Sequence, residues 1–214
     1  MDQDFWTPGR SAGVLLTLSI LVPAAIFVIL VIRGEMGGAN APFRGVTGIA
    51  EPPGAGLRRG RLFFVPAAIV LLVGYNLLTI QLQQSGDGIL SNLGLNLMLF
   101  MVMLHILEQT FHSIVTTWAL EETTQSGSVP PLYEQLRRWA TPAMQHAYML
   151  AGMLATALYG WAILQTGLLP GWIGWLSIGW GLLWIVLTLV AGEGFPLALY
   201  ILPFVIGIAL LVQS

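Results

Sequence analysis

Hydrophobic residues along this chain gather in six long runs, separated by polar segments or by segments rich in glycine and proline. Each run is close to the roughly 20 residues that an α-helix needs to cross the hydrocarbon core of a bilayer. The pattern predicts one domain, residues 1–214, that is an all-α polytopic membrane protein with a bundle of six transmembrane helices. We expect these helices at about residues 12–32, 62–82, 89–120, 143–164, 171–190 and 195–212. A five-helix alternative, with a re-entrant segment between the last two runs, stays open.

Two of the connections are long enough to carry structure of their own. Residues 34–60 are rich in glycine and proline and show no helical or strand periodicity, which predicts an irregular loop. Residues 131–139 place Leu132, Leu136 and Trp139 on one side at helical spacing, which predicts a short interfacial helix. The short segment before the third run contains Asp87, which we expect to be an exposed loop acid.

The arginines predict how the bundle is oriented. Cytoplasmic connections collect Lys and Arg, and seven of the eight basic residues flank the first and third connections, at positions 33, 44, 58, 59, 61, 137 and 138. The second and fourth connections contain no basic residue, and Arg10 is the one exception to the pattern. We therefore expect loop 34–60 in the cytoplasm and both termini on the non-cytoplasmic side.

Composition narrows the chemistry of the chain. Hydrophobic residues make up 56% of it and charged residues 8%, with a mean hydropathy of +0.80, so the lipid bilayer is its first partner. There is no lysine, which excludes a Schiff base to retinal or pyridoxal phosphate. There is no cysteine, which excludes an iron–sulfur cluster held by cysteines and a covalently attached haem. No basic patch with interleaved aromatic residues indicates nucleic acid. Other membrane subunits and a second copy of the chain stay open as partners.

The third run carries the candidate site. His105, Glu108, Gln109 and His112 lie near one face of a helix, because neighbours on a helix face recur every three or four residues, and Thr116 continues that stripe. The start of the fourth run brings Gln145 and His146 to a similar depth. We expect Glu108, His112 and His146 to meet, with His105 about 10 Å deeper from the rise of a helix.

Three interpretations of this site stay open. Two histidines and a carboxylate suit a transition metal, and His112 with His146 suits haem b, for which Gly152 and Ala155 could make room. The same side chains could relay protons or bind a substrate in a small transporter or ion pathway. They could also only hold the helices together by hydrogen bonds. Met98, Met101, Trp180 and Trp184 are candidates for a pocket wall, and the pairs Ser177 with Gly181 and Ala151 with Ala155 predict close helix contacts.

The C-terminal half contains the sequences His146-Ala-Tyr and Leu168-Leu-Pro-Gly-Trp-Ile-Gly-Trp-Leu, followed by another apolar helix. This part resembles a family of bacterial six-helix membrane proteins of unknown function, in which a short Gly-Leu-Pro connection joins two helices. The resemblance implies a compact six-helix bundle in the cytoplasmic (inner) membrane of a bacterium. It implies no catalytic residue.

Overall fold

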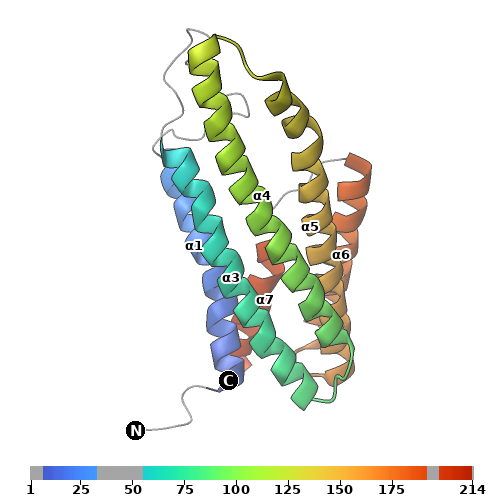
Figure 1. Cartoon of the computed structure of the whole chain (residues 1–214). Coiled ribbons are helices and arrows are strands. Elements are labelled where there is room, and N and C mark those ends of the chain that lie inside the picture. Colours follow the sequence, from blue (N-terminus) through green and yellow to red (C-terminus); the bar gives the residue numbers. More distant parts are fainter. Residues whose placement is uncertain (1–6, 33–54, 192–197, 214) are drawn as a thin grey trace.

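The computed structural model describes residues 7–32, 55–191 and 198–213, and all regular secondary structure in them is helical. Figure 1 shows the helices side by side in one elongated bundle. The six helices are α1 (Pro8–Ile32), α3 (Ala55–Gln84), α4 (Leu90–Ser126), α5 (Pro131–Thr166), α6 (Gly171–Ala191) and α7 (Ala198–Gln213). The expectation of an all-α bundle of six helices is confirmed.

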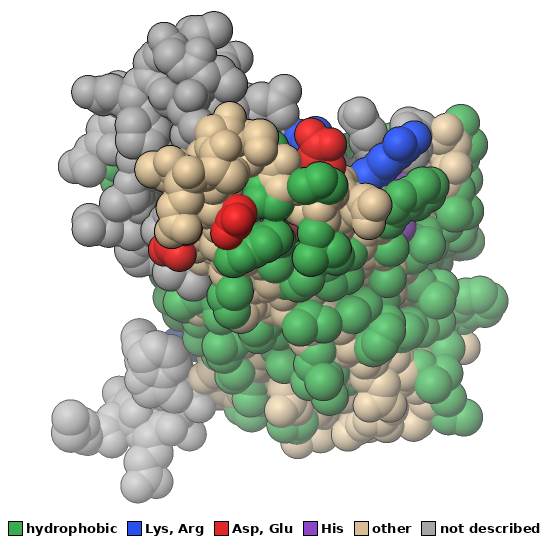
Figure 2. All heavy atoms as spheres, turned by 45° about the horizontal axis from the view of Figure 1, so that its top comes forward, with side chains coloured by type: hydrophobic (Ala, Val, Ile, Leu, Met, Phe, Trp, Pro, Cys, Tyr) green, Lys and Arg blue, Asp and Glu red, His purple; other side chains and the backbone are tan. Residues whose placement is uncertain are grey.

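Four of these helices contain segments that are long and apolar enough to cross a membrane: Val65–Gln84, Leu90–Ser126, Pro131–Thr166 and Gly171–Val190. α7 is apolar but shorter. Many large hydrophobic side chains are exposed on these helices, among them Leu107, Leu183 and Val190, as lipid contact requires. Figure 2 shows charged side chains gathered at one end of the molecule, above a surface of hydrophobic ones. These features indicate a membrane protein.

Each helix packs mainly on the helices that precede and follow it, and α7 returns to pack on α1. The order of neighbours is therefore α6, α5, α4, α3, α1, α7, with few contacts between α7 and α6. The start of α1 and the end of α7 lie at the same end of the bundle (Figure 1). Both ends of the described part of the chain thus lie at one end of the bundle.

The predicted interfacial helix at residues 131–139 is not a separate element. It is the beginning of α5, which continues without interruption through Pro142. A proline within a helix removes one backbone hydrogen bond and bends the helix, but it need not end it. The predicted loop 34–60 is also shorter at its end, because α3 already begins at Ala55. The rest of that loop and the predicted start of the last helix at residue 195 lie outside the described residues.

Glycines bring the helix backbones close together at two interfaces. A Cβ atom on Gly181 of α6 would lie 2.5 Å from the backbone oxygen of Met153 in α5, and one on Gly160 would lie 2.6 Å from the backbone oxygen of Gly174. Ser177, on the same face of α6, is fully buried. The predicted small-residue contact at Ser177 and Gly181 is therefore present, between α5 and α6.

The second close contact joins α1 and α7. A Cβ atom on Gly13 would lie 2.9 Å from the backbone oxygen of Gly207, and one on Gly207 would lie 2.8 Å from that of Gly13. Only residues without a side chain allow this approach.

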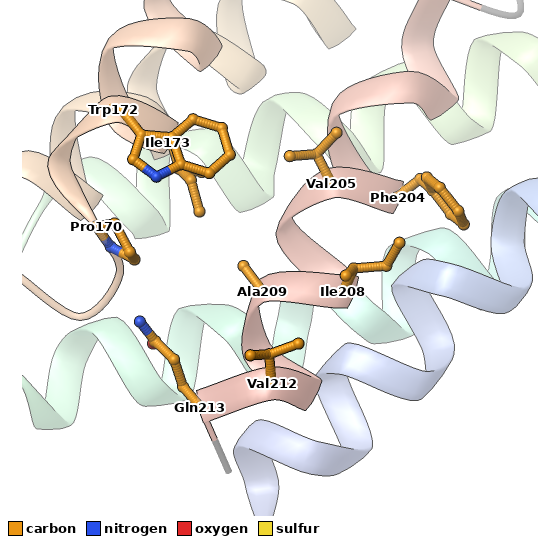
Figure 3. A pocket seen from close by; sticks show the side chains of 9 residues that line it. All are labelled: Pro170, Trp172, Ile173, Phe204, Val205, Ile208, Ala209, Val212 and Gln213. Carbon is orange, nitrogen blue, oxygen red and sulfur yellow. The ribbon is translucent and has the colours of Figure 1, made fainter.

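α6 and α7 touch near one end and diverge towards the other. The indole Nε1 of Trp180 donates a hydrogen bond to the backbone oxygen of Ala198, at 3.0 Å. Towards the opposite end an apolar groove of about 350 Å³ separates the two helices, with Trp172 and Ile173 on one wall and Val205 and Ala209 on the other (Figure 3). The bundle is thus open along this seam.

Candidate functional site

Near the middle of α4, polar side chains are buried where α4, α5 and α7 meet. His105 and Glu108 of α4 are 4% and 7% exposed, and Tyr148 of α5 and Tyr200 of α7 are 1% and 3% exposed. The rings of His105 and Tyr148 meet edge to face, with centroids 5.0 Å apart. Tyr148 also interacts electrostatically with Glu108 and Tyr200. We name these four residues, with Gln109, the His–Glu cluster.

Glu108 has the least usual environment of this cluster. Its Oε2 atom accepts a hydrogen bond from the side-chain Nε2 of the adjacent Gln109. An ionised carboxylate in an apolar interior costs several kcal/mol unless it is paired, so such groups bind a proton or a cation instead. The arginines of the described helices all lie within about two turns of the start of a helix, whereas Glu108 lies near the middle of one; they are Arg10, Arg58, Arg59, Arg61, Arg137 and Arg138.

His105 and Glu108 are both buried against Tyr148, although we expected His105 to lie one layer deeper than Glu108, His112 and His146. His146 is half-buried on α5, and its Nδ1 atom lies 2.6 Å from the backbone oxygen of Pro142 one turn before it. The side chain of His112 lies outside the described residues, so its meeting with Glu108 and His146 stays a prediction.

A metal centre built from the described residues alone is not present. No three His, Asp or Glu side chains among them lie close enough together to hold one ion. His105, Glu108 and His146 therefore do not form a ligand set by themselves.

The space beside Gly152, expected to admit a haem macrocycle, is filled. A Cβ atom on Gly152 would lie 2.5 Å from Cδ2 of Leu199 and 3.1 Å from Cγ of Met101. Ala155, the second residue expected to make room, is fully buried. Gly152 instead lets the start of α7 pack against α4 and α5.

The other residues that were predicted to form the site are buried in the hydrophobic core or half-buried. Met98 is fully buried in the core two turns before His105, and Met101 is almost fully buried one turn before it. Trp180 and Trp184 of α6 are half-buried and meet edge to face, with ring centroids 5.9 Å apart. Gln145 and Thr116 are half-buried, and the Thr116 hydroxyl has no hydrogen-bond partner within the described part of the chain. Trp180 and Trp184 pack against the hydrophobic core.

A second buried polar group, which we name the Tyr–Thr cluster, lies towards the other end of the bundle. It consists of Tyr75 and Thr79 of α3 and Thr156 and Tyr159 of α5, all at most 2% exposed. The hydroxyls of Tyr159 and Thr79 are 2.6 Å apart, and the two tyrosine rings are tilted with centroids 4.6 Å apart. The Tyr75 hydroxyl meets no hydrogen-bond geometry within residues 7–32, 55–191 and 198–213, although Thr156 lies near it. This cluster ties α3 to α5.

Asp87, expected to be an exposed loop acid, is buried. Only 5% of its surface is exposed, because its carboxylate turns inward to accept hydrogen bonds from the backbone N–H groups of Leu90 and Ser91, at 3.3 and 2.7 Å. Burial raises the pKa of Asp87, but the hydrogen bonds from Ser91, Leu90 and Ile89 outweigh burial, and the pKa is below its usual value. Asp87 is thus a cap of α4, whose dipole favours a negative charge there.

Tyr148 and Tyr200 are the members of the His–Glu cluster that the sequence did not single out. Tyrosine occurs at membrane interfaces as often as in bundle cores, so its position along a run does not mark it. The available signal was the spacing: Tyr148 follows His146 by two residues, and Tyr200 opens the last helix.

No protein-family model, curated protein or solved structure matches this chain.

Proposed function

We propose that this chain is a multi-pass protein of a bacterial cytoplasmic membrane that binds and releases a proton at the His–Glu cluster, as a step in carrying protons across the membrane. Both termini are then on the non-cytoplasmic side, and the charged end of the bundle in Figure 2 is in the cytoplasm. The arginine pattern supports this orientation.

The observation that carries the proposal is the burial of His105 and Glu108 beside Tyr148, in the middle of α4. Ionisable groups at this depth are costly and are common in proton pathways of pumps and transporters. Titratable groups from three helices meet at Tyr148 of α5: His105 and Glu108 come from α4, and Tyr200 comes from α7. An imidazole and a carboxyl group can exchange a proton between them, and the tyrosine hydroxyls can donate hydrogen bonds to either.

The cluster is closed to both faces of the bundle, because none of its four central side chains is more than 7% exposed. This burial supports a carrier in which Glu108 exchanges its proton when helices move. We expect slow turnover that saturates with the driving force, as in a carrier, rather than channel-like conductance.

Proton flux into liposomes tests the proposal. The full chain is reconstituted with a pH-sensitive dye inside, and a potassium gradient with valinomycin drives proton entry. We expect E108Q to fall to the rate of protein-free liposomes, since glutamine keeps the size of the side chain but binds no proton. E122Q is the matched control, because Glu122 is exposed near the end of the same helix.

Two outcomes would contradict proton binding. If liposomes with wild-type protein take up protons no faster than protein-free liposomes, the proposed function is wrong. Equal flux in E108Q and wild type would mean that the cluster only holds the helices together.

A metal ion bound by Glu108, His112 and His146 is the second candidate. The observation in its favour is the contact of His146 Nδ1 with the Pro142 oxygen. A backbone oxygen only accepts, so Nδ1 carries the proton, and Nε2 is left as an acceptor that could bind a metal. Elemental analysis of the purified protein tests this: a stoichiometric transition metal that is lost in H146Q supports the site, and its presence at the same level in H146Q excludes His146 as a ligand.

A further inference from the structure

The first three turns of α5 form an open hollow at the charged end of the bundle. Its volume is about 780 Å³, and both polar and apolar side chains line it, including Glu134, Gln135, Arg137, Arg138 and Trp139. The hollow is separate from the His–Glu cluster, which lies deeper in the bundle.

Apolar side chains beside the hollow are exposed. Trp139 is 69% exposed and Leu132 is 53% exposed, and the guanidinium carbon of Arg138 lies 5.5 Å from the centre of the Trp139 ring. Large apolar groups next to arginines are typical of a helix that lies at the boundary between headgroups and acyl chains. Because the apolar part of α5 follows directly after Pro142, the hollow lies at the level of the lipid phosphates.

The charges of the hollow indicate what it accepts. Arg137 and Arg138 are both exposed and offer donors to phosphate oxygens, and Gln135 adds a neutral donor. Glu134 leaves a net charge of one positive unit, which suits a single phosphodiester better than a headgroup with several phosphates. Its carboxylate can also accept a hydrogen bond from a headgroup hydroxyl.

We propose that this hollow binds the headgroup of an anionic phospholipid with one phosphodiester and a hydroxylated headgroup, of the phosphatidylglycerol type. Arg137 and Arg138 bind the phosphate, and the Glu134 carboxylate accepts a hydrogen bond from a headgroup hydroxyl. Trp139 and Leu132 lie against the acyl chains. This inference does not depend on proton binding at Glu108.

Native mass spectrometry of the full-length protein, titrated with phosphatidylglycerol, phosphatidylcholine or phosphatidylethanolamine, tests the proposal. We expect phosphatidylglycerol to bind most tightly. R137Q and R138Q should each lower the affinity for phosphatidylglycerol about fivefold. This factor corresponds to the roughly 1 kcal/mol that a basic residue contributes near an anionic surface. E134Q should bind about fivefold more tightly, and a gain cannot come from misfolding.

R10Q is the control, because Arg10 lies at the start of α1, at the other end of the bundle. Equal affinity for phosphatidylglycerol in wild type and in the double variant R137Q/R138Q would overturn the site. An equal loss in R10Q, or binding of phosphatidylethanolamine as tight as that of phosphatidylglycerol, would overturn it as well.

Discussion

The contact between α5 and α6 depends on glycine at position 181, and Gly181→Ala tests it. The added Cβ atom would lie 2.5 Å from the backbone oxygen of Met153 and 3.1 Å from Cβ of Ala157. A backbone oxygen cannot turn away as a flexible side chain can, so the two helices must separate. Inserting a methyl group into a packed interface costs about 1–3 kcal/mol. For a chain of this size about 2 kcal/mol lowers the melting temperature by roughly 4–8 °C.

Gly179→Ala is the matched control, two residues away on the same helix. A Cβ atom on Gly179 has no neighbour within 4 Å among the described residues, and the position is exposed. Alanine favours a helix over glycine by up to about 1 kcal/mol, so this variant should melt at the wild-type temperature or slightly above it. The assay is the heat-induced unfolding of each variant in the same detergent, followed by tryptophan fluorescence. Equal melting temperatures of the two variants would refute the close packing of α5 on α6 at Gly181.

Three further predictions concern polar contacts. Tyr159→Phe removes the 2.6 Å hydrogen bond to Thr79 and should lower the free energy of unfolding by about 1 kcal/mol, measured by thermal unfolding. Tyr75→Phe should lower it less. A larger loss in Tyr75→Phe than in Tyr159→Phe would contradict the Tyr–Thr cluster. Asp87→Asn should cost about 0.5–1 kcal/mol at neutral pH. Because the pKa of Asp87 is lowered on folding, its stabilisation is complete above the unfolded value of about 3.9 and is lost as the pH falls through the folded value, so wild type and Asp87→Asn should converge in acid. Trp180→Phe removes the bond to Ala198 and should speed amide hydrogen exchange at the start of α7; unchanged exchange would show that this bond does not hold the helix.

Much of the fold follows from the sequence, because a bilayer requires apolar helices of roughly the same length, and each appears in the sequence as one long apolar run. Six apolar runs gave six helices, since every backbone polar group in a bilayer must be bonded within its own helix. The boundaries at the polar ends were less certain. Residues 131–139 looked separate because they are amphipathic at helical spacing, whereas the run that follows is apolar. α5 nevertheless continues through Pro142, since one missing hydrogen bond does not end a helix.

The site was found in part. Helical periodicity placed His105 and Glu108 on one face of α4, and the structure buries both. The place of Tyr200 in the His–Glu cluster could not be predicted, because it depends on which helices are neighbours. The hydropathy of the sequence does not show that α7 packs near α4 and α5. Asp87 was misjudged for a similar reason: the sequence shows a polar turn, but not that the carboxylate folds inward to cap α4.

The contact between Gly13 and Gly207 joins the first helix of the chain to the last. During translation α1 leaves the ribosome long before α7, so one of its two packing surfaces has no protein neighbour while the four helices between them are made. The two glycines must stay accessible to each other across that interval. The bundle therefore closes only after α7 has been made, and until then α1 is packed on α3 alone among the described helices.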